Sequence, residues 1–309
     1  STPTPTPTPT PVVVPPVTPP VPGAPVRNPD GSTTWSGVGG RPSVVRGAIQ
    51  AAYEAAGAST SRLGLPDGDE IALRAGGSVQ RFARGLIYAS PATGAHVVSG
   101  EVERLYAARG WEGSALGYPT SGEIRLRADG VVQRFQGGLV YSSPAAGTHE
   151  VRGAFGDLYA RKGWEGGSLG YPTSDEIAVR GGVVQRFQGG LTYWTAATGA
   201  HEVKGAIGQL YASRGWEGGS LGFPTSEEVP LRDGGVVQRY LGGLVYWTPA
   251  TGPQAVQGAV LARYAALGWE NSALGYPVGA EFAVRGGVRQ EFQRGRLTVD
   301  PATGRVLPG

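Results

Sequence analysis

The sequence predicts an α+β fold of five tandem repeats, each a short helix plus a three-stranded antiparallel meander, closed into a pseudo-fivefold ring. Three observations support this prediction. A Leu-Gly-x-Pro tetrapeptide occurs five times, at spacings of 53, 53, 52 and 53 residues. Within each period the apolar residues change from helical to strand spacing. The 309 residues include 53 Gly, and many of these fall between predicted strands, where tight turns need them.

The tetrapeptide fixes the repeat period. Its copies are Leu63–Pro66, Leu116–Pro119, Leu169–Pro172, Leu221–Pro224 and Leu274–Pro277. A period near 50 residues is typical of repeat proteins whose units cannot bury a core alone. We therefore expect one repeat domain over residues 31–309, with repeats at about 44–96, 97–149, 150–201, 202–254 and 255–304.

Residues 1–30 are expected to lie outside this domain. They begin with alternating Thr and Pro, and residues 1–25 contain 11 Pro. Such a composition cannot bury a core and favours an extended polyproline II conformation. We expect a linker that connects the repeats to a segment upstream of it.

The third repeat shows the expected elements most clearly. Val151, Phe155 and Tyr159 recur at helical spacing and predict a helix over residues 151–162. Gly163 follows directly and suits the left-handed position that ends many helices. After the tetrapeptide we expect three short strands separated by Gly turns, over residues 177–179, 183–187 and 191–194.

Five such units can form an open solenoid or a closed ring. An open array needs polar caps, whereas the fifth repeat is as apolar on its helical face as the middle ones. The segment from Gly31 to Trp35 also resembles the third strand of a repeat. A terminal strand donated to the last unit closes the ring of a β-propeller, so we expect closure here.

Six tryptophans are candidate binding residues. Four of them follow a helix-ending Gly and precede a Glu: Trp111, Trp164, Trp216 and Trp269. An indole beside a carboxylate suits a sugar, whose CH face covers the ring while its hydroxyls bond to the acid; packing against the next repeat is the alternative. Trp194 and Trp247 stand on the third strand, where other repeats have Ala, Ser or Val. This tolerance predicts exposed side chains.

Polar candidates accompany these tryptophans. His149 and His201 lie in the predicted loop before the next helix, where they can bond glycan hydroxyls or cap that helix. Arg134, Arg186 and Arg239 alternate with core aromatics on the middle strand and are expected to face outward. The helix tyrosines are expected in the core: Tyr53, Tyr106, Tyr159, Tyr211 and Tyr264.

A Glu and an Arg recur at fixed distances after each tetrapeptide, as Glu176 and Arg180 do in the third repeat. Both survive in the first and fifth copies, which lose aromatic residues: Ala58 replaces Trp in the first, and Thr298 and Val299 replace Tyr-Trp in the fifth. We therefore expect a structural role, as an ion pair or as a carboxylate bonded to backbone NH groups.

Catalysis, a cofactor and a bound metal are not expected. Glycoside hydrolysis needs two carboxylates in unlike environments, whereas every repeat offers the same Glu in the same context. The sequence has no Cys, no nucleophile elbow, no metal-spaced His cluster and no phosphate loop. The net charge is +3 with basic residues scattered singly, which argues against nucleic acid. No apolar run reaches the length of a membrane span.

The repeats resemble the LGFP repeat family, named for the motif that reads LGLP, LGYP and LGFP in this chain. The resemblance covers roughly residues 44–304, and Phe187 to His201 is the fullest match. It implies a secreted actinobacterial cell-wall protein that binds cell-wall glycan of the arabinogalactan and peptidoglycan class without catalysis. We expect a multivalent monomer that anchors an upstream catalytic domain. A protein–protein interaction scaffold of propeller-like repeats is the alternative.

Overall fold

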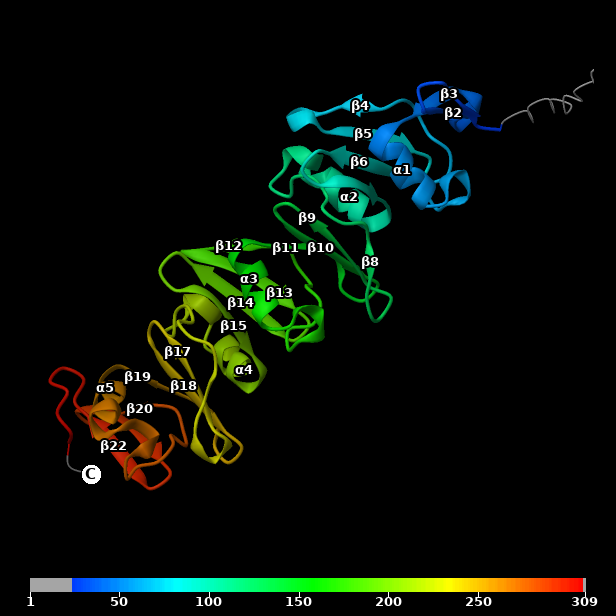
Figure 1. Cartoon of the computed structure of the whole chain (residues 1–309). Coiled ribbons are helices and arrows are strands. Elements are labelled where there is room, and N and C mark those ends of the chain that lie inside the picture. Colours follow the sequence, from blue (N-terminus) through cyan, green and yellow to red (C-terminus); the bar gives the residue numbers. More distant parts are fainter. Residues whose placement is uncertain (1–23, 308–309) are drawn as a thin grey trace, which may run out of the picture. The chain divides into compact units, whose positions relative to one another are not determined.

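The computed structural model describes residues 24–307 of the chain, which divides into two compact units, Ser1–Pro91 and Ala92–Gly309 (Figure 1). Both units consist of short helices and antiparallel strands. Most of the expected linker, residues 1–23, lies outside the described residues. Its last part contains strand β1 (Val26–Arg27).

The first unit holds a small sheet in which β2 (Thr33–Ser36) pairs with β1 on one edge and with β3 (Pro42–Val45) on the other. Helix α1 (Gly47–Ala55) follows and buries Ile49 and Tyr53. A second antiparallel set follows α1: β4 (Ile71–Ala72), β5 (Ser78–Phe82) and β6 (Gly85–Ser90).

The second unit repeats one order of elements: a strand, a helix and a meander of further strands. The strands before the helices are β7 (Gly94–Val98), β11 (Gly147–Arg152), β15 (Gly199–Lys204) and β19 (Gly252–Gln257). The helices are α2 (Gly100–Arg109), α3 (Gly153–Arg161), α4 (Gly205–Ser213) and α5 (Gly258–Leu267). The remaining strands are β8 (Ile124–Arg125), β9 (Val131–Phe135), β10 (Gly138–Ser143), β12 (Ile177–Val179), β13 (Gly182–Phe187), β14 (Gly190–Thr195), β16 (Val229–Pro230), β17 (Val236–Tyr240), β18 (Gly243–Thr248), β20 (Phe282–Val284), β21 (Gly287–Phe292) and β22 (Gly295–Val299).

The three predicted strands of the third repeat are present as β12, β13 and β14, but the middle sheets have a fourth strand that the prediction missed. The additional strands are β11, β15 and β19, and each pairs along its whole length with the strand before it. Residues 199–204, predicted as loop, form a strand because both faces are covered: Val203 lies in the core and Glu202 is bonded to neighbouring cations. Helix α3 therefore begins at Gly153, and Val151 belongs to β11.

Helices and sheets alternate through the second unit. Helix α4 contacts β14 and β15 on one side and β18 and β19 on the other, so that two sheets and one helix share a core (Figure 1). That core joins Val184 of β13, Tyr211 of α4 and Val245 of β18. The five helix tyrosines are 0% exposed, which confirms their predicted place in the core. Within the second unit, the third and fourth repeats thus complete one core together.

A buried glutamine on the middle strand bonds each sheet to the preceding one. The side-chain amide of Gln185 donates to the carbonyl of Glu150 in β11 at 2.7 Å and to that of Ser174 at 2.9 Å. The equivalent residues make the same two bonds and, like Gln185, are 0% exposed: Gln80, Gln133, Gln238 and Gln290. The amide oxygen has a partner only at Gln238, which accepts from the Tyr240 hydroxyl at 2.9 Å; at the other four it has no hydrogen bond within residues 24–307.

These unsatisfied oxygens predict that Phe187→Tyr stabilises the protein. Phe187 occupies the position of Tyr240, and the new hydroxyl is expected to donate to the Gln185 amide oxygen. An unsatisfied buried acceptor costs about 1–3 kcal/mol, so we expect a gain near 1 kcal/mol in the free energy of unfolding, measured by urea denaturation. The reverse change, Tyr240→Phe, should lose a similar amount. Destabilisation by Phe187→Tyr together with stabilisation by Tyr240→Phe would contradict the proposed hydrogen bond to the glutamine.

Candidate functional site

A cleft of about 660 Å³ lies between the sheet of the third repeat and the turn that follows helix α4 in the fourth repeat. Its walls come from Arg186 on β13, Tyr193 on β14, and Trp216 with Glu217 in the single-turn 3-10 helix η6 (Trp216–Gly218). Ile177 of the edge strand β12 completes it and is 38% exposed. Two exposed apolar side chains thus flank one carboxylate and one guanidinium.

An unusual backbone conformation positions the indole. Gly215 and Trp216 are both left-handed, with φ of +87° and +55°. This region is rare for a bulky residue, yet Trp111, Trp164 and Trp269 adopt it too. Ala58 shares the conformation in the first unit. The backbone turn therefore belongs to the repeat itself, and the indole is a side chain added at a position that the fold already supplies.

Each indole in this turn is anchored at one edge. Trp216 meets Tyr211 edge-to-face at 5.8 Å between ring centroids, and Trp164 meets Tyr159 in the same way at 5.7 Å. Trp216 and Trp164 remain 39% exposed. The ring contact is to the helix of the same repeat, not to the next repeat as the packing alternative had it, and the rest of the indole is left uncovered.

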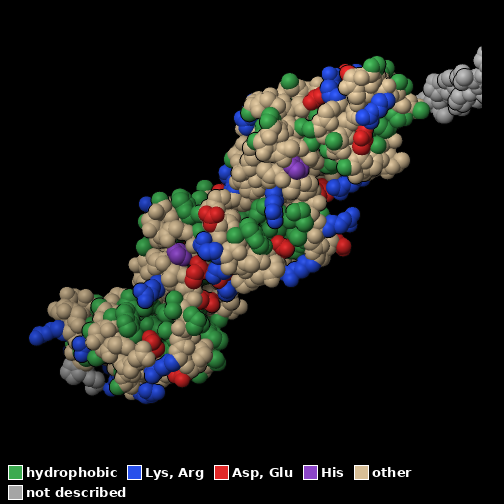
Figure 2. Space-filling view, viewed as in Figure 1, with side chains coloured by type: hydrophobic (Ala, Val, Ile, Leu, Met, Phe, Trp, Pro, Cys, Tyr) green, Lys and Arg blue, Asp and Glu red, His purple; other side chains and the backbone are tan. Residues whose placement is uncertain are grey.

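The carboxylate of the cleft is held by a core hydroxyl. Tyr193 donates a hydrogen bond to Glu217, and burial together with the nearby carboxylate raises the pKa of Tyr193. Tyr141 donates to Glu165 in the same way. The positive Arg186 faces outward, as predicted for this position, and balances the charge of Glu217. Figure 2 shows charges of both signs scattered between hydrophobic patches on the face in view.

An equivalent, smaller cleft of about 160 Å³ lies one repeat earlier. It is lined by Ile124, Arg134, Tyr141, Trp164 and Glu165. The structure therefore brings Trp164 together with Arg134 and Trp216 together with Arg186. One repeat later, Trp269 is 36% exposed and Glu270 is only 7% exposed. Burial and the nearby Glu270 raise the pKa of Tyr246, and Arg239 lowers it.

Trp194 and Trp247 lie elsewhere, and the prediction that they are exposed is wrong. Both are half-buried, because their strand position faces the preceding helix rather than solvent. Trp194 lines a small hollow with Phe155 of α3 and Glu176. Trp247 occupies the same position beside α4. They do not contribute to the clefts of Trp164 and Trp216.

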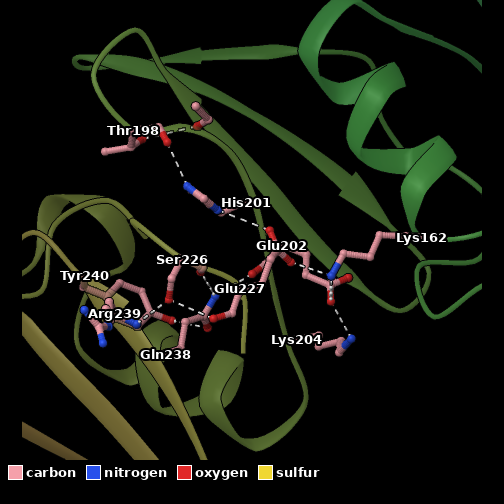
Figure 3. A network of polar contacts seen from close by, with 11 residues as sticks. Lys162, Thr198, His201, Glu202, Lys204, Ser226, Glu227, Gln238, Arg239 and Tyr240 are labelled. Atoms are coloured by element: carbon pink, nitrogen blue, oxygen red, sulfur yellow. Dashed lines mark hydrogen bonds and ion pairs between the residues drawn. The ribbon is translucent and has the colours of Figure 1, made fainter. Parts of the chain in front are cut away.

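His149 and His201 lie on β11 and β15, not in a loop, and they do not cap a helix. Nε2 of His201 bonds to the carbonyl oxygen of Thr198 at 2.8 Å, and Nδ1 lies 3.2 Å from Glu227 of the following turn (Figure 3). His149 makes the matching contacts with Ala146 and Asp175. Each histidine therefore bonds to the carbonyl of its turn and lies beside an acidic side chain.

These contacts are part of an ionic clasp, which we define as Lys162, His201, Glu202, Lys204 and Glu227 (Figure 3). Lys162 at the end of α3 pairs with Glu202, at 2.7 Å, and with Glu227. Glu202 is 2% exposed, which an isolated charge could not be without large cost. An equivalent clasp one repeat earlier consists of Arg109, His149, Glu150, Arg152 and Asp175.

The recurring Glu and Arg make structural contacts with other residues. Arg127 donates to the backbone carbonyl of Glu165, and Arg232 to that of Glu270. The carboxylate of Glu281 accepts from the backbone NH of Gln257 at 2.8 Å. The predicted carboxylate bonded to backbone NH is present at Glu281, and an ion pair to a different arginine is present at Glu176, which lies 3.5 Å from Arg152.

Within residues 24–307, no group of three or more His, Asp and Glu side chains is arranged to hold a metal ion. None of the helices in that part of the chain is long and apolar enough to cross a membrane.

Repeats that share a core with the next repeat and form a cleft at the junction define a tandem-repeat protein. Its repeats match the LGFP repeat at residues 63–114, 116–167, 169–219, 221–272 and 274–307. The chain therefore belongs to the LGFP repeat family, as the sequence predicts.

Comparison with other proteins adds little to this assignment. No curated protein matches the sequence. A virginiamycin B lyase from Staphylococcus aureus is 10% identical, with 81% of this chain and 70% of that chain covered at a TM-score of 0.13. The extracellular domain of a putative one-component system from B. thetaiotaomicron is 11% identical, with 92% and 36% covered at a TM-score of 0.16. Similarity at these TM-scores supports no conclusion about this chain.

The clasp predicts a pH window of maximal stability. The hydrogen bond to Glu227 raises the pKa of His201 above 6.5, so this contribution is complete below pH 6.5 and is lost as pH rises through the folded value. The partners of Glu227 lower its pKa below 4.5, so its contribution is complete above pH 4.5 and is lost on acidification. We expect the clasp to contribute most between about pH 4.5 and 6.5.

Thermal unfolding across pH checks this window. His201→Gln imitates the natural Gln254, which keeps the bond to its turn carbonyl at 3.0 Å but cannot titrate. This variant should lose the decline above pH 6.5 and keep the acid limb, whereas Glu227→Gln should weaken both limbs. A pH profile that neither substitution changes would show that the clasp does not cause the pH dependence of stability.

Proposed function

We propose that this chain is a non-catalytic module that binds cell-wall polysaccharide through the clefts of Trp164 and Trp216. The observation that carries the proposal is the recurrence of one chemical arrangement in consecutive repeats. Each cleft combines an exposed indole, an exposed Ile, a carboxylate fixed by a tyrosine, and an arginine. Two clefts in one chain that share these residue types suit a ligand that repeats as well.

The chemistry of the cleft suits a glycan. Indole and isoleucine offer apolar surface for the CH face of a sugar, while Glu217 accepts from hydroxyls and Arg186 donates to them. Because the two charges balance, the cleft attracts neither strong anions nor strong cations. A volume of about 660 Å³ is in the range of small-ligand sites.

Repetition of weak sites explains how such a module anchors a protein. Linked sites on one polymer gain from effective concentration, and avidity exceeds each single affinity by about 10² to 10⁴. LGFP repeats are typical of extracellular and cell-surface proteins. On these grounds we propose a secreted monomer that holds an upstream catalytic domain at a wall of the arabinogalactan and peptidoglycan class.

The exposed row of aliphatic side chains supports a second candidate function. Ile124, Ile177 and Val229 occupy equivalent edge-strand positions and are each 38% to 42% exposed. Recurrent apolar surface of this kind also suits a protein partner, as in a scaffold of propeller-like repeats. Retention on wall from which protein has been removed separates the two functions, because a scaffold needs the protein.

Closure of the repeats into a ring stays a prediction. Strand β2, expected to close it, has both edges paired inside its own unit. Closure through that strand therefore needs β1 to give way. Small-angle scattering distinguishes a compact ring from an open array by the radius of gyration.

Removal of the two cleft indoles tests the proposed function. Trp164→Ala with Trp216→Ala should lower retention on protein-free insoluble cell wall by at least about tenfold, because two of the linked sites lose their stacking surface. The pair Trp194→Ala and Trp247→Ala is the matched control. It should reduce thermal stability, since these rings pack on helices, and leave retention intact at temperatures where the protein stays folded.

Circular dichroism must show that both double variants are folded. Wild-type retention by the folded cleft variant would refute binding at these indoles. Loss of retention in the folded control variant would move the site to the hollows beside α3 and α4.

A further inference from the structure

The turn after the first meander strand has two lengths, and from the second repeat to the fifth the long and the short turn alternate. Arg127-Ala128-Asp129-Gly130 in the second repeat and Arg232-Asp233-Gly234-Gly235 in the fourth have one residue more than Arg180-Gly181-Gly182 in the third. This deletion accounts for the single spacing of 52 residues. In the third repeat Val179 pairs directly with Gly182, so that Arg180 and Gly181 form a tight two-residue hairpin.

The longer turn reaches across to the next repeat. The Arg127 guanidinium donates to the backbone carbonyl of Glu165, which directly follows Trp164. The backbone of this turn is held in place from the next tetrapeptide, because the Tyr171 hydroxyl donates to the Arg127 carbonyl at 2.7 Å. The fourth repeat has the same pair of bonds, from Arg232 to Glu270 and from Tyr276 to Arg232 at 2.7 Å.

The shorter turn makes neither bond. Within residues 24–307, Arg180 is exposed and has no hydrogen bond or ion pair. Phe223 stands where Tyr171 and Tyr276 stand in the other repeats, and its ring packs over Gly182, where an added Cβ would come within 2.8 Å of the ring. Tyrosine thus follows a long turn and phenylalanine a short one, since only the long turn presents a carbonyl to the hydroxyl.

The clefts also differ in size. The cleft beside the short turn measures about 660 Å³ and the cleft beside the long turn about 160 Å³. Eight lining positions are common to both, and the larger cleft also extends over residues 187–190 between β13 and β14. One contributor is Leu126, which lines the smaller cleft where the shorter Val179 lines the larger. At the second long turn, Glu270 is 7% exposed, so its carboxylate is nearly withdrawn from solvent.

We infer that the cleft of Trp216 is the open binding site of the second unit, and that Arg127 and Arg232 latch the equivalent sites at Trp164 and Trp269. This inference rests on the proposed function and adds an order of use to it. The open cleft takes the first uncharged glycosyl segment. A latched site accepts a further segment only when its arginine leaves the backbone carbonyl, which lowers the affinity of that site.

Release and installation of the latch test the inference in opposite directions. The probe is soluble arabinogalactan, titrated while the intrinsic tryptophan fluorescence is recorded. The double variant Arg127→Ala and Arg232→Ala should bind about tenfold more tightly than the wild type, because linked sites become available. Insertion of Ala after Arg180 together with Phe223→Tyr should weaken binding about tenfold, because the third repeat then has a long turn and its tyrosine.

Arg285→Ala is the matched control. Arg285 begins the short turn of the fifth repeat and has no hydrogen bond or ion pair within residues 24–307, so its loss should leave the affinity unchanged. If the insertion variant fails to fold, the arginine variants still decide, since their substitutions lie on exposed turns.

The outcomes separate the two proposals. A wild-type protein that binds, with unchanged affinity in the Arg127 and Arg232 double variant, overturns the latch and leaves the proposed function standing. A wild-type protein that binds neither soluble arabinogalactan nor insoluble wall overturns the proposed function, and the latch with it.

Discussion

The fold depends on one amide group per repeat. The middle-strand glutamine is fully buried and donates two hydrogen bonds, one of them to the last strand of the preceding sheet. A buried amide without partners carries a large desolvation cost, so a neighbouring sheet in any other register is penalised. Hydrophobic contact brings repeats together, but Val and Leu do not distinguish one register from the next. The glutamine supplies that distinction and thereby sets which strand each tryptophan meets.

The clefts exist only because register is fixed in this way. Arg186 and Tyr193 come from one repeat, and Trp216 and Glu217 come from the next, so the cleft needs both. Candidate binding sites in such a protein therefore form at the junctions between consecutive repeats. A junction can vary by a single residue in a turn, as between Arg127 and Arg180, while the core around it stays the same. Identical scaffolds thus carry sites of different accessibility.

The sequence predicts the parts of this protein that depend on local chemistry. The period, the core tyrosines, the helix-ending glycines and the outward arginines all follow from spacing and side-chain type, and all are confirmed. The fourth strand could not be predicted, because Glu202 and Lys204 look like loop residues until the fold brings Lys162, at the end of α3, beside Glu202. The exposure of Ile177 could not be predicted either, because the alternation of apolar and polar residues along a strand does not show which edge of the sheet remains uncovered. The glutamine does leave a signal, since it recurs on the middle strand of all five repeats.

The matching of turn length to the following aromatic has a consequence for how such arrays evolve. Arg127 and Tyr171 are 44 residues apart in sequence and form one functional pair. Recombination with a break between them joins a short turn to a tyrosine, or a long turn to a phenylalanine. A break between Tyr171 and Arg180 keeps every pair intact. In this chain, the segment that can be exchanged while keeping each turn with its aromatic is therefore offset from the structural repeat, and it runs from one turn to the next tetrapeptide.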